Sequence, residues 1–502
     1  MTALKPAIVS PATERGYNYS LISQAVICIF GQMKGEKGKK GKNSMRNAKY
    51  IFAILAIGLL AGSALAADRY VVEPGKIANG NDLAPYNTWT NAATNIQWAV
   101  NVATNGDTVW VSNGTYYCSG VSTSAYMFNT NIYTNTAMVM ITNSITVQSV
   151  NGYTNTVVDG NWPFWTTTVF HVYATGAVLS GLTVTNGVVL TSEWRWGAQS
   201  TVGAGVYFCG KLVTNCLITG NVYSNYAAGI QYHAGALCVT TGDVSHCIIR
   251  GNRAYGTYVY GSGYSIYNTG GTRTWLITNC EVSYNYSHHA RNLGALRMLV
   301  AKAKAVNCNV HHNNSAGIEI DGPDSVAESC VSSSNNHGLW FNGMGGLAKN
   351  CLIIGNANNG VQCANQVGSE KIESCTIVNN GIGVTFDTRT SSVFTAVNCV
   401  IYDNATNWVH AGTNMSYTNC CTYPLPTNVS DRSIGAGNIT NAPMLVDTNS
   451  GNYRLAANSP CINTGANQGW MTNSGDLDGR MRIRYGRADM GPTRPFTMEP
   501  YL

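Results

Sequence analysis

The chain has 502 residues, of which 45% are hydrophobic and only 11% are charged, and its formal net charge at pH 7 is +6. Much of the positive charge precedes residue 45, at Lys34, Lys37, Lys39, Lys40 and Lys42. The remainder has no basic stripe with interleaved aromatic residues, which argues against nucleic acid as a partner.

Residues 45–66 have the pattern of a secretory signal peptide. Arg46 and Lys49 precede an apolar stretch that starts at Ile51 and ends in an Ala-x-Ala cleavage site at Ala66. The stretch is short for a membrane span, so we expect none in the mature chain and a secreted or extracytoplasmic location, in the periplasm or at the cell surface. We interpret residues 1–44 as an upstream extension or a mis-assigned start.

Residues 67–106 are predicted to form an N-terminal cap. Ile96, Ala99, Val100 and Ala103 follow the i, i+3, i+4, i+7 spacing of one apolar helix face. The repeats that follow indicate a solenoid, and the apolar end of a solenoid must be covered to prevent end-to-end stacking. This short helix is the expected cover.

Residues 107–440 carry a repeat in which a cysteine is followed five residues later by an asparagine. Between Cys308 and Cys399 the cysteines recur every 21 to 24 residues, and earlier intervals are longer. A period of this length is typical of solenoids, in which each repeat stacks only on its neighbours. The eight pairs are Cys216/Asn221, Cys247/Asn252, Cys280/Asn285, Cys308/Asn313, Cys330/Asn335, Cys351/Asn356, Cys375/Asn380 and Cys399/Asn404.

Each repeat reads as three short strands joined by bends. Apolar residues alternate around each cysteine, and a Gly-apolar-x-apolar segment follows each asparagine, as in Gly317–Ile320. Alternation at period two indicates half-buried strands, and the Asn and Gly positions indicate turns. This pattern predicts an all-β right-handed parallel β-helix whose coils stack about 4.8 Å apart.

Stacking brings like residues of successive coils into contact. We expect the asparagines to pass amide hydrogen bonds from coil to coil while they adopt the left-handed backbone of a tight bend, and the cysteines to act as apolar fillers. There is no Cys-x-x-Cys motif. Stacked Cβ vectors point the same way, which disfavours disulfides along the ladder. Cys118, Cys420, Cys421 and Cys461 lie off the predicted ladder and are either paired or free.

The repeat ends near residue 441, and residues 441–502 are predicted to form a C-terminal cap packed on the last coil. Asp476-Leu477-Asp478-Gly479 within it is either a turn or part of a calcium site.

These features resemble the pectate-lyase-like right-handed β-helix superfamily, and in particular secreted bacterial proteins with a right-handed β-helix region. The repeat carries the likeness over residues 107–420, and the Trp-x-x-Ala-Ala helix before it and the Asp-Leu-Asp-Gly block after it resemble the flanks of those proteins. The superfamily contains lyases, glycoside hydrolases, esterases and adhesins. The Asp-Asp, Gly-His-Gly and Trp-Ile-Asp-His motifs of its polygalacturonases and pectate lyases are missing from this sequence.

The resemblance implies that a lyase of this kind would abstract the proton next to a uronate carboxyl with an Arg or Lys base, while calcium neutralises that carboxyl. Charged residues concentrate between Arg291 and Asp324. Glu319 and Asp321, projecting outward about 7 Å apart, and Asp324 are the expected calcium ligands. The expected bases are Lys302, Lys304 and Arg297, and the expected substrate-binding residues are Trp340, Asn342 and Gln362.

Several alternatives remain open at this point. The same charges are also consistent with an ordinary solvated face. Glu328, Lys349 and Glu373, which recur at Cys−2 and form an alternating charge ladder, need no function. The leading hypothesis is a monomeric polysaccharide-binding protein, a uronate lyase if it is an enzyme. The alternatives are a non-catalytic adhesin-like surface protein and a glycoside hydrolase.

Overall fold

The computed structural model describes residues 66–76, 82–128, 131–191, 203–225, 235–256, 262–266, 273–288, 293–343, 345–364, 368–387, 393–410, 415–425 and 432–493. All of them belong to one compact unit, residues 66–502. The predicted signal peptide and the extension before it lie outside the described residues, so both remain predictions.

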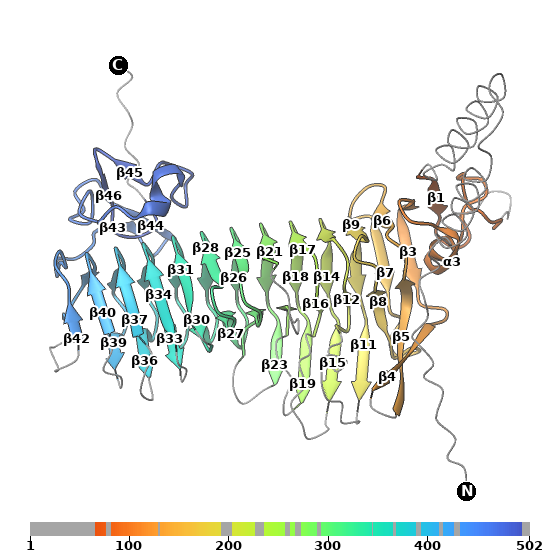
Figure 1. Cartoon of the computed structure of the whole chain (residues 1–502), viewed down its shortest axis with the longest axis horizontal. Helices are drawn as coiled ribbons and strands as arrows, with labels where there is room; N and C mark the ends of the chain where they lie inside the picture. The colour runs from red at the N-terminus through yellow and green to blue at the C-terminus, as the bar shows by residue number, and fades with distance from the viewer. Residues whose placement is uncertain are drawn as a thin grey trace, which may run out of the picture. The chain divides into compact units, whose positions relative to one another are not determined.

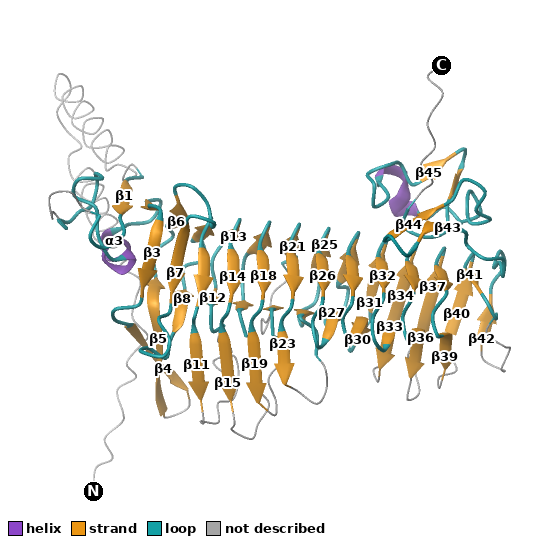
Figure 2. Ribbon diagram, turned by 180° about the vertical axis from the view of Figure 1, so that it is seen from behind, coloured by secondary structure: helices purple, strands orange, loops and turns teal. Residues whose placement is uncertain are grey.

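Three long sheets of stacked strands make up the solenoid, and each coil from β6 (Thr146–Ser149) to β39 (Thr406–His410) contributes one strand to each sheet (Figure 1; Figure 2). Sheet A consists of β1 (Asp68–Val71), β2 (Thr108–Val111), β6 (Thr146–Ser149), β9 (Val178–Ser180), β13 (Leu212–Thr214), β17 (Asp243–Ser245), β21 (Trp275–Thr278), β25 (Ala303–Val306), β28 (Val326–Glu328), β31 (Gly346–Lys349), β34 (Ser369–Glu373), β37 (Val393–Val397), β40 (Met415–Thr418) and β42 (Arg432–Ile434).

Sheet B consists of β3 (Gly114–Tyr117), β7 (Thr156–Asp159), β10 (Thr183–Thr185), β14 (Leu217–Thr219), β18 (Ile248–Arg250), β22 (Glu281–Ser283), β26 (Asn309–His311), β29 (Val331–Ser333), β32 (Leu352–Ile354), β35 (Thr376–Val378), β38 (Val400–Tyr402) and β41 (Cys421–Thr422).

Sheet C consists of β4 (Ser122–Phe128), β5 (Asn131–Ile141), β8 (Thr168–Val172), β12 (Val206–Phe208), β16 (Leu237–Val239), β20 (Tyr264–Ile266), β24 (Leu296–Met298), β27 (Ala316–Ile320), β30 (His337–Phe341), β33 (Asn359–Ala364), β36 (Ile382–Asp387) and β39 (Thr406–His410). In four coils the chain forms one further strand after its sheet B strand, and these strands make up a smaller parallel sheet D. They are β11 (Val188–Thr191), β15 (Val222–Asn225), β19 (Arg253–Gly256) and β23 (Tyr286–His288).

Strand neighbours in sheets A, B and C pair in parallel within the described residues, except the antiparallel pair β4–β5 at the start of the solenoid. Along one coil the chain passes from sheet A to B to C, and alternate residues of each strand point into the core. In the coil of β25, β26 and β27, Ala305, Val310, Ile318 and Ile320 are buried. This period-two alternation is the feature that the sequence pattern predicted.

The cysteine ladder lies at the corner between sheets A and B. The thiols of Cys330, Cys351 and Cys375 each donate to the carbonyl oxygen two residues before them, at 3.2–3.4 Å. The described cysteines are free thiols, Cys118, Cys421 and Cys461 included. Cys420 extends the ladder, because its thiol donates to the carbonyl oxygens of Thr418 and Ala396 in the same way. Its assignment as an off-ladder cysteine was therefore wrong.

The asparagine ladder lies at the corner between sheets B and C and is buried. The side-chain oxygen of Asn335 accepts from the backbone N–H and side-chain amide of Asn313, at 3.0 and 2.9 Å. The prediction that these asparagines adopt the left-handed backbone is wrong. The left-handed residues are the one just before the cysteine and the one just before the asparagine. Ser329 has φ 54° and Ser334 has φ 55°. The two bends thus flank the sheet B strand, and the ladder asparagine follows the second bend.

Helix α3 (Ile96–Val102) begins at Asn95, whose side chain caps the N–H of Gln97. Its residues Ile96, Ala99 and Val100 are buried with the valines of β1 and β2. The predicted apolar helix face therefore packs onto the first strands of sheet A.

The C-terminal segment, residues 439–493, contains the hairpins β43 (Leu445–Asp447) with β44 (Asn452–Leu455) and β45 (Ile483–Arg484) with β46 (Arg487–Ala488), and the 3₁₀ helix η2 (Gly469–Asn473). It was predicted to pack on the last coil. Instead, Leu455, Cys461 and Met490 pack against the outward side chains of sheet B, among them Val378 and Val400. The segment therefore covers the side of several coils, as Figure 1 shows.

Candidate functional site

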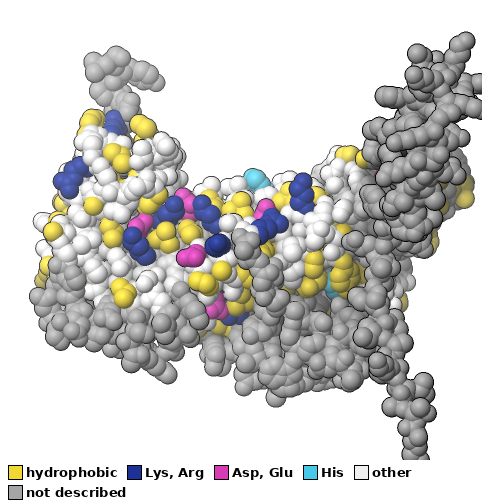
Figure 3. Space-filling view, in the orientation of Figure 1, with side chains coloured by type: hydrophobic (Ala, Val, Ile, Leu, Met, Phe, Trp, Pro, Cys, Tyr) yellow, Lys and Arg dark blue, Asp and Glu magenta, His cyan; other side chains and the backbone are white. Residues whose placement is uncertain are grey.

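Two parallel rows of outward side chains run along sheet A beside the C-terminal segment. The strand register places Lys304, Val326, Leu347 and Lys371 in one row. The second row contains Val306, Glu328, Lys349 and Glu373. Figure 3 shows cationic and anionic side chains gathered on this face next to the C-terminal segment. Five of these eight side chains are charged, so charge is concentrated on this face.

Glu328 is the centre of the charged rows. Its carboxylate lies 2.6 Å from the amino group of Lys304 and 3.1 Å from that of Lys349. Burial alone would raise the pKa of Glu328, but the hydrogen bonds from these two lysines outweigh it, and the pKa is lowered. Glu328 is therefore a fixed anion held between two cations.

Trp470, from helix η2, contacts Lys349 and Glu373 of the second row. Its indole N–H donates to Glu373 at 2.6 Å, and the Lys349 amino group lies over its ring at 4.7 Å. Lys371 contacts the same Glu373 carboxylate at 2.5 Å. A cation over an aromatic face is a favourable arrangement, so the C-terminal segment is tied electrostatically to sheet A.

A groove of about 620 Å³ lies between these coils and the C-terminal segment. Asn307, Asn309 and Glu328 line one wall, and the other is lined by Ser474, Gly475, Asp476, Leu477 and Gly479. Lys304 and Lys371 keep 37% and 40% of their side chains exposed. A ligand on this face can therefore reach both lysines.

The Asp476-x-Asp478-Gly479 motif at the groove is a turn. One carboxylate oxygen of Asp476 accepts from the backbone N–H groups of Asp478 and Arg480, and Asp478 pairs with Arg454. Burial raises the pKa of Asp476. Among the described residues no group of three His, Cys, Asp or Glu side chains could hold a metal ion. The calcium alternative for this motif thus has no support from the geometry.

The predicted ligands Glu319 and Asp321 lie on a different sheet, with Arg297 beside them. Both side chains leave the outward side of sheet C, but Glu319 is fully buried rather than projecting into solvent. Its carboxylate lies 3.0 Å from Arg297 Nε and accepts from Gly294 N at 2.7 Å. Arg297 also contacts Asp321 at 2.8 Å. The prediction that Glu319 is an accessible calcium ligand is not consistent with this burial.

This buried cluster is structural in character. Burial raises the pKa of Asp321 in spite of the nearby Arg297, and the neighbouring Glu319 adds to the rise. A guanidinium held between two carboxylates satisfies buried charges that would otherwise be costly. Arg297 cannot act as a base while it holds both carboxylates.

The remaining predicted residues fall in two further places. Lys302 and Asp324 are exposed, with φ 63° and 59°, in the turns that lead from sheet C to sheet A. Lys304 lies in the charged rows described above. The nine predicted site residues are therefore divided among sheet C, sheet A and the turns between them.

Trp340, Asn342 and Gln362 follow the buried cluster on sheet C. Trp340 and Gln362 are in register with Glu319 and half-buried, and Asn342 donates to Glu319 at 2.9 Å. His337 lies 6.2 Å from Trp340 between ring centroids. Their use in substrate binding is still a prediction.

Sequence reasoning missed Trp470. It identified Asp476–Gly479 only as a turn or part of a calcium site, and not as one wall of a groove. These residues have no counterpart in the repeat, so their position over sheet A could not be predicted from the period. The alternating charges of Glu328, Lys349 and Glu373 were recognised in the sequence, and they were the available signal for a charged face on sheet A.

Residues 265–422 match the family model described as right handed beta helix region. A comparison with curated proteins found no match. Among solved structures, pectate lyase Pel9A is similar, with 14% identity, a TM-score of 0.48 and coverage of 86% of this chain and 97% of that chain.

A rhamnogalacturonan lyase is 14% identical, with a TM-score of 0.41 and coverage of 73% of this chain and 90% of that one. The A-module of the Azotobacter vinelandii mannuronan C-5 epimerase AlgE6 is 12% identical, with a TM-score of 0.34 and coverage of 66% and 95%. At these values the likenesses assign no activity. The family match and the stacked parallel sheets confirm the predicted fold, a right-handed parallel β-helix.

Proposed function

We propose that the protein binds an acidic polysaccharide along the outward face of sheet A, beside the C-terminal segment. The observation that carries this proposal is the row Lys304, Val326, Leu347, Lys371. Two exposed cations are separated by three strand spacings, roughly 14 Å, with half-buried apolar side chains between them. This alternation suits sugar rings that present an apolar face and carry carboxylates at intervals.

The lysines retain donors for a ligand although each is ion-paired. A lysine ammonium has three N–H donors, and the carboxylates of Glu328 and Glu373 occupy only part of that capacity. Glu328 and Glu373 fix the amino groups in position, which lowers the entropy lost when a ligand binds. The expected ligand carboxylates therefore meet preorganised cations.

Cleavage by β-elimination is a second candidate function. Lys304, one of the three predicted bases, lies on this face, 2.6 Å from Glu328. A base must reach the proton next to the uronate carboxyl, and the amino group of Lys304 is already held by the Glu328 carboxylate. The geometry therefore supports binding more strongly than proton abstraction.

Affinity electrophoresis of the chain from residue 67 onward tests the binding proposal. The panel contains uronate-rich and neutral polysaccharides, each with and without calcium. We expect retardation by the acidic polymers, and Lys304→Ala and Lys371→Ala each weaken it by about two- to five-fold, since an exposed charged contact contributes roughly 0.5–1 kcal/mol.

Arg250→Ala is the matched control, because it removes an exposed cation from sheet B. Equal loss in all three variants would mean that net charge, not this face, drives binding. The ultraviolet absorbance of new unsaturated sugar ends, followed in the same incubations, decides whether cleavage accompanies binding.

A further inference from the structure

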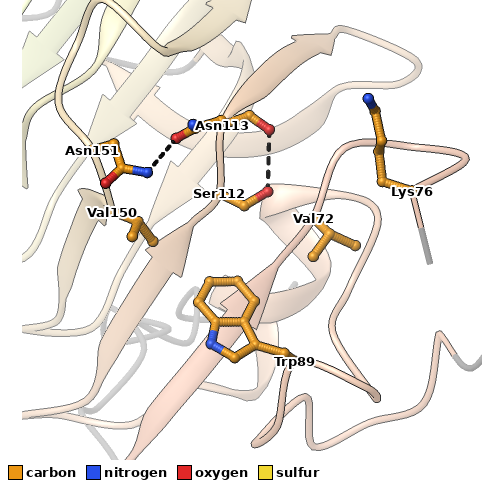
Figure 4. A pocket seen from close by; sticks show the side chains of 7 residues that line it. All are labelled: Val72, Lys76, Trp89, Ser112, Asn113, Val150 and Asn151. Atoms are coloured by element: carbon orange, nitrogen blue, oxygen red, sulfur yellow. Dashed lines mark hydrogen bonds between the residues drawn. The ribbon is translucent and has the colours of Figure 1, made fainter. Parts of the chain in front are cut away.

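A second hollow lies at the other end of the solenoid. It has a volume of about 390 Å³ and is formed by the chain after β1, the turn at Trp89, and the corners between sheets A and B in the first two coils. Figure 4 shows Trp89 below Ser112, with Asn113 and Asn151 on one side and Lys76 on the other. The hollow contains no residue of the groove described above.

Trp89 provides an exposed aromatic surface that is held in place. Its side chain is 44% exposed, and its ring lies 4.4 Å from that of Tyr70 between centroids. The turn that carries it is fixed by a hydrogen bond from Ala92 N to Trp89 O. Val150, across the hollow, is also 42% exposed. Two large apolar side chains exposed around one concave surface are less usual than a single exposed residue.

Asn113 and Asn151 provide an adjacent donor and acceptor. The Asn151 amide donates to Asn113 Oδ1 at 2.9 Å. This bond leaves the Asn113 amide group as donor and Asn151 Oδ1 as acceptor, and neither takes part in another side-chain hydrogen bond within the described residues. Neighbouring hydroxyl groups of a sugar offer the complementary acceptor and donor.

Lys76 provides a cation at the opposite rim. It is 71% exposed, and its amino group lies 3.7 Å from Glu73. The hollow therefore combines an aromatic face, an amide pair and an exposed ammonium group. Aromatic surface with a few placed polar groups is the usual composition of a small-molecule site.

We propose that this hollow holds one sugar ring of an acidic polysaccharide, with the apolar side of the ring on Trp89, hydroxyl groups at Asn113 and Asn151, and a carboxylate toward Lys76. This inference rests on the proposed function and adds to it a second subsite at the N-terminal end. Both sites adjoin the corner between sheets A and B. From β6 to β25 there are five strand steps, roughly 24 Å, so a long chain can occupy both sites and a trisaccharide cannot.

Occupation of both sites by one chain makes the second binding event intramolecular, which raises the overall affinity for the polymer. We expect Trp89→Ala to weaken polymer binding by about tenfold or more. Trp98→Ala is the matched control, because Trp98 is 46% exposed on α3 and outside the hollow. It should leave polymer binding unchanged.

Calorimetry with a uronate trisaccharide isolates the two sites. The Lys304→Ala/Lys371→Ala protein should still bind the trisaccharide, and adding Trp89→Ala should abolish that remaining binding. Lys76→Gln should reduce the preference for the acidic trisaccharide over a neutral one. Circular dichroism confirms that each variant is folded.

The outcomes separate the two proposals. If wild type binds acidic polymers but Trp89→Ala behaves like Trp98→Ala, the N-terminal subsite is wrong and the groove stands. If the trisaccharide binds only to proteins that keep Trp89, and the Lys304→Ala and Lys371→Ala variants bind polymer as tightly as wild type, the groove is wrong and the hollow is the site. Absence of binding to any member of the panel overturns both.

Discussion

Glu370 lies at a core position where neighbouring coils place Gly346, Phe394 and Met415. It is 4% exposed, and one of its carboxylate oxygens has no hydrogen-bond partner among the described residues. Burial raises the pKa of Glu370 to about 7. The nearby thiol of Cys363 also has its pKa raised, first by burial and then by Glu370. A carboxyl group in this setting is destabilising once it ionises.

The pH dependence follows from the sign of that shift. The folded-state pKa lies above the unfolded value of 4.5, so the unfolded chain releases the proton first. Stability therefore falls as the pH rises from about 4.5 to about 7, and stays lower above that range. Glu370→Gln should flatten this part of the profile and stabilise the protein at pH 8, on the order of 3 kcal/mol. Denaturant unfolding at pH 5 and pH 8 measures it, and an identical pH profile in variant and wild type would contradict the assignment.

Glu328 should behave in the opposite way, because its pKa is lowered by Lys304 and Lys349 in spite of burial. The stability it contributes is present above the unfolded pKa and is lost as the pH falls through the depressed folded pKa. Glu328→Gln should therefore destabilise at pH 7 and have little effect in strong acid. Thermal melts across the acid range check this. A variant as stable as wild type at pH 7 would show that the ion pairs of Glu328 with the two lysines contribute no stability.

At the scale of the elements, the asparagine ladder ties sheets B and C together. Asn335 is 2% exposed, donates to Val310 O at 2.9 Å and to Ser332 Oγ at 3.1 Å, and accepts two hydrogen bonds from Asn313. Its removal leaves several buried polar groups without partners, and each costs about 1–3 kcal/mol.

Asn335→Ala should therefore lower the free energy of unfolding by about 3 kcal/mol or more. Asn309→Ala is the control, because Asn309 is exposed on β26 and precedes the same ladder. Chemical denaturation of the two variants compares them. Equal stability would mean that the ladder is stabilised by backbone pairing alone.

The strands, the two ladders and the coil period were predictable from the sequence because each is written repeatedly along the chain. It was also predictable that the Glu319 side chain leaves the outward side of its strand. Its burial was not predictable. Whether an outward carboxylate meets solvent depends on groups of the neighbouring coil that the repeat does not specify, here Arg297 and the backbone N–H of Gly294. In the same way, the corners from sheet A to sheet B and from sheet B to sheet C place Lys304 and Glu319 on different faces although they are close in sequence.

At the scale of the whole molecule, the solenoid and the C-terminal segment are joined through the bend residues before the cysteines. Asn398 has φ 57°, and its amide donates to Ala466 O and accepts from Ala466 N, both at 2.7 Å. The side-chain amides of Asn350 and Asn419 donate to Gly475 O and Thr464 O, each at 3.2 Å. In coils outside the segment the equivalent position is exposed, as at Asn215. One repeated bend thus provides both the corner of the coil and the attachment point of the segment.

Asn398→Gly separates these two roles, because glycine keeps the left-handed backbone at little cost and removes only the amide. We expect faster amide hydrogen exchange in residues 464–491, while the core strands of the solenoid keep their protection. Asn215→Gly is matched in backbone conformation, with φ 53°, and should leave exchange in the segment unchanged. If both variants behave alike, the segment is held by the apolar contacts of Leu455, Cys461 and Met490. If Asn398→Gly also weakens polysaccharide binding, then the wall of the groove depends on this attachment. The same segment supplies that wall and positions Trp470 beside Lys349.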